Sequence, residues 1–359
     1  MHEWSVGTPA SRKWGLTQPS SSPLAGVRYG MEGRLERRYS SYTTDGIPMK
    51  TTLHASVILT LSFVCRPVSA QWLQPGASDF AKSETRVLPV RKNITLIQIR
   101  TPQAPFNIVV LAGSDGYLLV DHPEPAGNPA IQKALDGMGK RPVKFLLNTH
   151  WHYDHVGGNE VYGPEATIVA QENVRKRLMT KQTPFWSGTP IGPYPERAWP
   201  DITFRDMLTI HFAGEDVELD HYANGHTDGD SVVYFAHANV VAVGDIFLGK
   251  ASVIGSADIE GIVQSLNAVL DRINDDTVII TGHGEISNRR DLAQFVQFLN
   301  QTVALVRQEI ATGRSEKDVA AAGLPELWKP WFAPDAVPAE HEFMQGIYAT
   351  LTHTNNLNQ

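Results

Sequence analysis

The sequence predicts an α/β (α+β) protein in which mixed β-sheets are covered by helices, in a layered αββα arrangement within one domain. Three observations support this prediction. Short β-branched and apolar segments, mostly linked as hairpins, dominate the first half of the folded region. Helical segments fall between some of these strands and again near the C-terminus. The chain has 359 residues, which is long enough to bury a large core.

The expected strands are short apolar runs bounded by turn residues, and they span 94–100, 106–112, 117–121, 143–148, 167–170, 208–212, 217–219, 231–235, 240–243 and 278–281. The segment Gly113-Ser114-Asp115-Gly116 predicts a hairpin turn between two of them. Helices are expected over 128–135, 172–179, 260–273 and 289–311, and the last of these stops at Gly313. Asn128 followed by Pro129 predicts a helix start, with a capping residue before a proline at the first helical position.

The first 70 residues differ in character from the rest. Residues 1–48 are rich in Ser, Gly, Arg and Tyr and have no apolar periodicity, which predicts a disordered segment or an extension translated from an upstream start codon. Residues 49–70 have a basic start, a short apolar run and a small residue at the end, the pattern of a signal peptide cleaved before Gln71. The apolar run is too short to span a bilayer as a permanent helix.

Two consequences follow if residues 71–359 form the mature domain. The protein is then periplasmic or secreted, with no stable membrane anchor. Its only cysteine, Cys65, leaves with the signal, so the mature domain has neither a disulfide framework nor a cysteine metal ligand. The alternative is that the apolar run is a buried strand or helix of the fold. His54 within the run and Arg66 near the cleavage site support this alternative, because neither is typical of a signal peptide there.

Charge narrows the range of partners. The whole chain has a formal net charge of −7, and residues 1–70 contribute more basic than acidic side chains, so the remainder is more acidic still. We therefore expect no binding to nucleic acid, whose phosphates require a basic surface. A small-molecule substrate is expected instead. The sequence does not predict an oligomeric state.

The most informative stretch is a loop rich in metal-ligating side chains. His150, His152, Asp154 and His155 fall within six positions, directly after the expected strand 143–148. Imidazole is the commonest zinc ligand, and carboxylates also bind zinc. A polar loop that happens to be rich in histidine is the alternative. Three further residues oppose that alternative because each lies at an expected strand end: His226, Asp245 and His283. This set suits two adjacent zinc ions.

With these residues in this order, the chain resembles the metallo-β-lactamase fold hydrolases. The resemblance covers residues 71–359 and implies a four-layer αββα metallo-β-lactamase sandwich. It implies two Zn²⁺ ions per chain, with the first bound by His150, His152 and His226, the second by Asp154, His155 and His283, and both bridged by Asp245. Members that degrade antibiotics have a cysteine or a serine in the place of Asp245. An aspartate there is usual in glyoxalase II, lactonases and phosphodiesterases of the superfamily.

These residues imply a secreted dinuclear zinc hydrolase in which a metal-bound hydroxide attacks a small-molecule amide or ester carbonyl. Asp154 is the expected catalytic residue because its carboxylate can orient the attacking oxygen as well as bind metal. Lactone and β-lactam rings are candidate substrates, with weak β-lactamase activity expected because of Asp245. The alternatives are a thioester hydrolase resembling glyoxalase II and a phosphodiesterase. A non-catalytic metal-binding module is a further alternative, which the complete ligand set opposes.

Residues around the ligands are candidates for supporting roles. Asp121, Asp228 and Asp230 could accept hydrogen bonds from ligand imidazoles, although each could also be a turn or cap residue. Candidate substrate contacts are Trp151 and Tyr153 beside the ligands, Trp186 in the aromatic-rich loop 180–200, and Lys250, which could instead be a solvated loop lysine. The aromatic residues of the C-terminal tail are expected to pack against the fold. The remaining histidines, which include His122, have no partner pattern and are expected to be ordinary surface or core residues.

Overall fold

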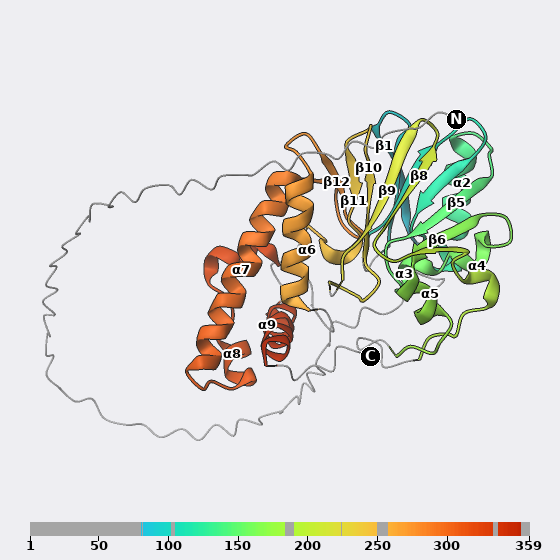
Figure 1. Ribbon diagram of the computed structural model, residues 1–359. Coiled ribbons are helices and arrows are strands. Elements are labelled where there is room, and N and C mark those ends of the chain that lie inside the picture. Colours follow the sequence, from blue (N-terminus) through green and yellow to red (C-terminus); the bar gives the residue numbers. More distant parts are fainter. Residues whose placement is uncertain are drawn as a thin grey trace, which may run out of the picture. The chain divides into compact units, whose positions relative to one another are not determined.

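Two β-sheets packed face to face form the centre of the fold, with helices on both outer faces (Figure 1). This computed structural model describes residue 80 and the ranges 82–101, 105–183, 190–223, 225–249, 258–332 and 337–352. These residues lie in one compact unit of the chain. The predicted αββα layering is confirmed, and it places the ends of several strands from both sheets along one edge.

The first sheet changes from antiparallel to parallel at its middle strand. Its order is β1-β2-β3-β4-β5-β6-β7, with antiparallel pairing from β1 to β4 and parallel pairing from β4 to β7. The strands are β1 (Glu84–Arg91), β2 (Ile94–Arg100), β3 (Pro105–Ala112), β4 (Tyr117–Val120), β5 (Val143–Asn148), β6 (Thr167–Gln171) and β7 (Ile202–Phe204).

The second sheet is antiparallel except for one parallel pair, β11 with β12. Its order is β13-β12-β11-β10-β9-β8. The strands are β8 (Met207–Phe212), β9 (Glu215–His221), β10 (Ser231–Phe235), β11 (Val240–Ala242), β12 (Val278–Ile280) and β13 (Ser287–Asn288). Because β11 and β12 run in parallel, the segments that leave their C-terminal ends lie side by side.

The helices divide between the two outer faces. Those that follow strands of the first sheet are α2 (Asn128–Gly137), α3 (Tyr153–Val156), α4 (Asn159–Tyr162) and α5 (Glu172–Leu178). Those after β11 are α6 (Ile259–Arg272), α7 (Arg289–Ala311), α8 (Glu316–Ala322) and α9 (Val337–Leu351). The described residues also include four short 3₁₀ helices: η1 (Pro125–Gly127), η2 (Glu196–Ala198), η3 (Gly244–Ile246) and η4 (Glu326–Trp331).

Apolar side chains fill the three spaces between the four layers. Leu96 of the first sheet and Phe235 of the second belong to the cluster between the sheets. Ile131 of α2 packs in a second cluster with side chains of β2 and β3, and Leu266 of α6 packs in a third with Phe298 of α7 and side chains of β10 and β11. Burial of each such side chain stabilises the fold by about 1.5–3 kcal/mol. These packed cores therefore hold in place the strand ends that carry the polar residues.

The predicted strands and helices are all present, with differences of one or two residues at most ends. One difference has a clear cause: β4 ends at Val120 because Asp121 adopts a left-handed backbone conformation, with φ 61°. Another is a correction. Asn128 is the first residue of α2 rather than its N-cap, because η1 runs directly into the helix and places Gly127 at the cap. The edge strand β1 was not predicted, since its residues are mostly exposed and it contains a proline.

The C-terminal aromatic residues pack as predicted. Phe343 stacks on Phe298 of α7 with ring centroids 5.5 Å apart, and Phe332 meets Phe343 edge-on. Trp328 and Trp331 pack against the same cluster. The predictions for residues 1–70 lie outside the described residues. Within the described part, no helix is both long and apolar enough to cross a bilayer.

Candidate metal centre

Five segments deliver the predicted ligands to one edge of the sandwich. His150 and His152 follow β5, and Asp154 and His155 lie on the short helix α3. The other three come from the second sheet: His226 from the β9–β10 turn, Asp245 from η3 after β11, and His283 from the loop after β12. The structure therefore brings together all seven residues that the sequence singled out, in two groups of three and four side chains.

The first group contains three imidazoles. His152 Nδ1 lies 3.0 Å from His150 Nε2 and 2.9 Å from His226 Nε2. His150 and His152 are buried, whereas the side chain of His226 is 21% exposed. Solvent therefore reaches this group mainly at His226. The three imidazoles point their nitrogen atoms toward a common centre.

The second group combines two imidazoles with two carboxylates. His283 Nε2 lies 3.0 Å from Asp154 Oδ2 and 3.3 Å from His155 Nε2. His155 Nε2 lies 3.4 Å from Asp245 Oδ1. In a tetrahedral zinc site with bonds of about 2.0–2.2 Å, neighbouring ligand atoms are about 3.3 Å apart. The spacing within this group therefore fits a metal ion.

Asp245 stands between the two groups. Its Oδ2 lies 3.8 Å from His226 Nε2 in the first group and 3.4 Å from His283 Nε2 in the second. Its Oδ1 is buried and makes no hydrogen bond with any residue that the structure describes. A buried carboxylate oxygen without a donor is costly, and a cation would satisfy it. This orphaned oxygen is the clearest sign that the group holds metal.

Hydrogen bonds to the outer ring nitrogens orient three of the imidazoles. His155 Nδ1 donates to Asp121 Oδ2 at 2.9 Å, and His283 Nδ1 donates to the Pro105 carbonyl at 2.8 Å. His150 Nδ1 lies 3.1 Å from Thr149 Oγ1, whose own hydrogen goes to Asp121 Oδ2. These partners place the ring proton on Nδ1 and leave each Nε2 lone pair facing the group. Two facing lone pairs repel each other unless a proton or a metal ion lies between them.

The ionisation of the second group supports the same conclusion. Burial alone would lower the pKa of His283, but the carboxylates of Asp245 and Asp154 raise it to about 10. Burial would raise the pKa of Asp245, yet His283 and His155 hold it well below its usual range. Without metal, the imidazoles therefore carry protons that balance the carboxylates. A divalent cation can replace those protons, since ligands bind metal in their deprotonated form.

Two glycines allow the strand ends around Asp245 to approach one another closely. A Cβ atom at Gly282 would collide with Asp245 Oδ1. Gly244 has φ +53°, and a Cβ there would lie 2.8 Å from Thr149 Oγ1. The close approach of the β5, β11 and β12 ends therefore depends on glycine at both positions.

The three aspartates predicted to support the ligands have different contacts. Asp121 contacts His155, as expected. Asp230 instead accepts hydrogen bonds from the backbone N–H and the hydroxyl of Thr227, so it holds the loop that carries His226 rather than an imidazole. Asp228 pairs with Arg177 at 3.0 Å, so its predicted contact with a ligand imidazole is wrong.

Two of the four predicted substrate contacts, Trp151 and Tyr153, lie in the described part of the chain. Trp151 packs beside the His152 ring, with centroids 4.5 Å apart, and Tyr153 is buried. Burial, together with Asp154, raises the pKa of Tyr153, so its phenol stays protonated. Trp186 and Lys250 lie outside the described residues.

Sequence reasoning missed several residues around the centre. Thr149 links Asp121 to the ligand loop through its hydroxyl and its backbone N–H. Both carboxylate oxygens of Glu124 are buried without a hydrogen-bond partner in the described structure, and burial raises the pKa of this group to about 8. Asn107 accepts from Gln98 and donates to the Thr281 and Gly284 carbonyls, which supports the His283 loop. The sequence signal was a position beside a ligand for Thr149 and a polar residue within an apolar strand for Asn107, and Glu124, in the loop after β4, had neither.

Comparison with known proteins places these observations in context. Residues 104–283 match the family described as the metallo-beta-lactamase superfamily. A hydroxyacylglutathione hydrolase from Crocosphaera subtropica is 24% identical over 229 residues, which cover 59% of this chain and 80% of the relative. A metallo-beta-lactamase type 2 from Bacillus cereus is 24% identical over 193 residues, which cover 52% of this chain and 69% of the relative.

Solved structures share the same fold. A metallo-beta-lactamase from Pontibacter korlensis aligns with a TM-score of 0.52 at 19% identity, over 60% of this chain and 99% of its own. A sec-alkylsulfatase from Pseudomonas sp. aligns with a TM-score of 0.60 at 15% identity, over 74% of this chain and 50% of its own. At these identities the likeness concerns the fold alone.

Proposed function

Because the chain belongs to the metallo-beta-lactamase superfamily of hydrolases, we propose that it is a dinuclear zinc enzyme that cleaves a small-molecule ester or amide, with a lactone or other unhindered ester favoured over β-lactams. The observation that carries this proposal is the position of Asp245 between two groups of ligand atoms. A carboxylate there can hold two cations close together, which is what a shared nucleophile requires.

The assignment of ligands follows the two groups. His150, His152 and His226 would hold the first zinc ion, and Asp154, His155 and His283 the second, with Asp245 between them. When bound, two zinc ions supply Lewis-acid activation of water and of the substrate carbonyl. Imidazole and carboxylate donors suit zinc, and the described residues contain no cysteine that would favour a softer metal.

The side chains of this chain would then divide the remaining work. The Asp154 side chain is 14% exposed, so its carboxylate can accept a hydrogen bond from the attacking water and fix its direction while it binds metal. Asp121 holds the His155 ring in place through Nδ1, and Thr149 ties Asp121 to the ligand loop. Burial raises the pKa of Tyr194, so its phenol stays protonated.

A second candidate is a thioesterase that resembles glyoxalase II. The relatives named as hydroxyacylglutathione hydrolases favour it, at 24% and 27% identity. Two features of this chain oppose it: the signal-like segment 49–70, because glutathione thioesters are cytosolic, and the acidic net charge, because glutathione carries carboxylates.

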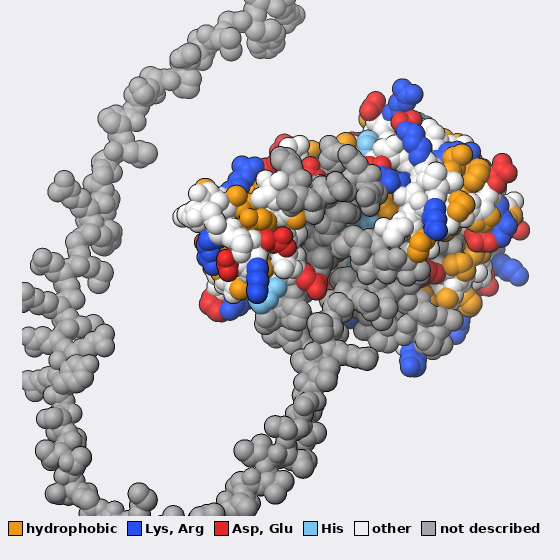
Figure 2. All heavy atoms as spheres, turned by 90° about the horizontal axis from the view of Figure 1, so that it is seen from below, with side chains coloured by type: hydrophobic (Ala, Val, Ile, Leu, Met, Phe, Trp, Pro, Cys, Tyr) orange, Lys and Arg blue, Asp and Glu red, His pale blue; other side chains and the backbone are white. Residues whose placement is uncertain are grey.

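A small-molecule substrate and export to the periplasm or medium form part of the proposal. The formal net charge of −7 disfavours nucleic acid and other polyanions. Figure 2 supports this view for one face, where basic and acidic side chains alternate over the described surface instead of gathering by sign.

The test has two parts. Metal content is measured by mass spectrometry on full-length protein purified without chelators, and about two zinc ions per chain are expected. Turnover is then measured on chromogenic lactones, esters, β-lactams, thioesters and phosphodiesters. Preferential cleavage of a lactone or ester supports the proposal, and preferential cleavage of a thioester or a phosphodiester would replace it with that alternative.

A further inference from the structure

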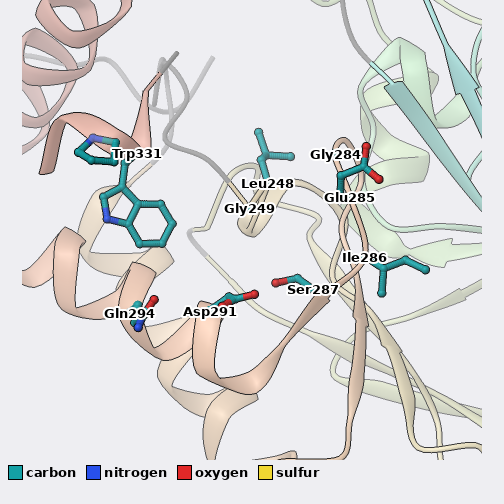
Figure 3. Close-up of a pocket in the computed structure, with 10 residues that line it drawn as sticks. Leu248, Gly249, Gly284, Glu285, Ile286, Ser287, Asp291, Gln294 and Trp331 are labelled. Atoms are coloured by element: carbon teal, nitrogen blue, oxygen red, sulfur yellow. The ribbon is translucent and has the colours of Figure 1, made fainter. Parts of the chain in front are cut away.

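A cavity lies between the loops that follow Asp245 and His283 and the start of α7 (Figure 3). Its volume is about 530 Å³, which is within the range of small-molecule sites. Its inner wall begins at Gly284, the residue after His283, and at Leu248, three residues after Asp245. The two segments touch there, since a Cβ on Gly284 would lie 2.9 Å from the Leu248 carbonyl oxygen. The segments that carry His283 and Asp245 therefore also supply one wall of this cavity.

The far wall of the cavity belongs to the C-terminal part of the chain. Trp331 of η4 and Gln294 of α7 face Leu248 across the cavity in Figure 3. Both lie beyond residue 283, where the match to the superfamily ends. Trp331 is fixed by stacking on Phe298, with ring centroids 5.6 Å apart. This wall of the cavity is thus held by a packed aromatic core.

The lining combines apolar walls with negative charge. Leu248, Ile286 and Trp331 supply apolar surface, whereas Glu285 and Asp291 supply carboxylates. None of the ten residues that line this described cavity is Lys, Arg or His. Arg100 is nearby, but it is paired with Glu285. The positive N-terminus of α7 is also occupied, because Asp291 lies in its first turn and is hydrogen-bonded to the Asn288 cap.

We propose that this cavity holds the non-reacting arm of the substrate, and that this arm is apolar and ends in a cationic or hydrogen-bond-donating group. The inference rests on the proposed esterase activity for its reacting centre, but the cavity and its charge are independent of it. An indole wall suits a ring or a quaternary ammonium. An anionic arm would meet the Asp291 carboxylate and no cationic lining residue, which opposes a dicarboxylate such as glutathione.

The first experiment measures turnover by zinc-loaded, full-length enzyme. Three 4-nitrophenyl esters share one aromatic acyl arm and differ only at its far end, which carries trimethylammonium, methoxy or carboxylate; 4-nitrophenyl acetate has no arm. We expect kcat/KM to be at least tenfold higher for the cationic ester than for the anionic one. Glu285→Lys should reduce this ratio by about tenfold, whereas Asp275→Lys, at an exposed position outside the cavity, should leave it unchanged.

The second experiment fills the cavity. Gln294 and Gln297 are both exposed on α7, but only Gln294 lines the cavity. Gln294→Trp should raise KM for the arm-bearing esters tenfold or more and leave turnover of 4-nitrophenyl acetate unchanged. Gln297→Trp should alter neither. Equal KM values for the two variants would overturn the assignment of the cavity, and a preference for the anionic ester would overturn the assignment of the arm.

A binding measurement tests the cavity without any catalysis, so it can separate this inference from the proposed function. The free trimethylammonium acid is titrated calorimetrically into metal-free protein and into both tryptophan variants. Binding that Gln294→Trp weakens tenfold, and Gln297→Trp does not, supports the cavity even if no ester is hydrolysed. No binding to the wild-type protein, in the presence of ester hydrolysis, would reject the cavity while leaving the proposed function intact.

Discussion

Asp121 Oδ2 accepts a hydrogen bond of 2.9 Å from His155 Nδ1, and this bond joins the end of β4 to the ligand loop after β5. Asp121 reaches the imidazole because its left-handed backbone, with φ 61°, turns the chain at the end of the strand. Asp121 also accepts from the hydroxyl and backbone N–H of Thr149. One buried carboxylate therefore orients both a ligand ring and the loop that carries the other ligands.

Asp121→Asn tests this relationship. The amide keeps the shape but loses the charge and one acceptor, so the His155 ring is less firmly held. We expect the affinity for the second zinc ion to fall by about 10–100-fold, measured by competition with a chromogenic chelator. Asp228→Asn is the control, because Asp228 pairs with Arg177 and not with a ligand. Equal zinc affinity in the two variants would contradict the role of Asp121.

His283→Ala tests the division into two groups. This change removes one of four donors from the second group and none from the first, so we expect zinc content to fall from about two ions to about one. Metal is measured by mass spectrometry after dialysis, with the exposed His237→Ala as control. Wild-type protein that contains one metal or none when purified without chelators would contradict the dinuclear assignment.

Asp245 decides between substrate classes. We expect weak β-lactam turnover in the native protein and better turnover of a lactone or ester. Asp245→Ala should weaken zinc binding by ~10–100-fold or more, since direct ligands contribute at least as much as outer partners. Asp245→Cys keeps a ligand for the second zinc but cannot bridge through two oxygens, so it separates loss of a ligand from loss of the bridge.

Two outcomes would count against Asp245 as the bridge. One is native hydrolysis of penicillins or carbapenems near the diffusional ceiling of about 10⁸ M⁻¹s⁻¹, which would replace the ester proposal with an antibiotic substrate. The other is an Asp245→Ala variant that retains two zinc ions and full activity on every substrate.

His122 predicts a pH dependence of stability. It is fully buried, and burial lowers its pKa from 6.5 to about 4. Between these values the unfolded chain binds a proton that the folded chain does not, so stability is retained above pH 6.5 and falls as the pH decreases toward 4. The loss from this residue is on the order of 3 kcal/mol.

The measurement is urea unfolding of metal-free protein from pH 7 to pH 4.5. His122→Gln should flatten the decline relative to wild type, because glutamine does not titrate. His211→Gln, at a largely exposed position, should leave the slope unchanged. Parallel slopes for wild type and His122→Gln would show that His122 is not the group responsible.

If residues 49–70 act as a signal peptide, the exported protein should begin at or near Gln71. The protein is expressed from Met1 and from Met49 in a bacterial host, and secreted or periplasmic material is sequenced from its N-terminus. Both forms should yield the same mature end, and therefore the same melting temperature, because the two mature chains would be identical. Active extracellular protein with an intact end before residue 49 would contradict this prediction.

The layers of the fold and the seven ligand candidates could be predicted from the sequence because both depend on local patterns. Apolar runs mark buried strands, and a ligand at a strand's C-terminal end, such as Asp245 or His283, is placed by the strand itself. The spacing from His150 to His155 is similarly local. Short elements such as α3 carry too few residues for a periodic signal, and they were found only in the structure.

Contacts between distant segments were decided by the tertiary structure. The sequence marked Asp121, Asp228 and Asp230 as equivalent candidates, and only packing made Asp121 the partner of His155. The cavity wall at Trp331 is likewise invisible in the sequence, where that residue reads as core. Local patterns report which face of a strand or helix is buried, but not which remote side chain arrives on that face. The path of the chain in three dimensions decides this, and here it places Trp331 across a cavity from Leu248, three residues after Asp245.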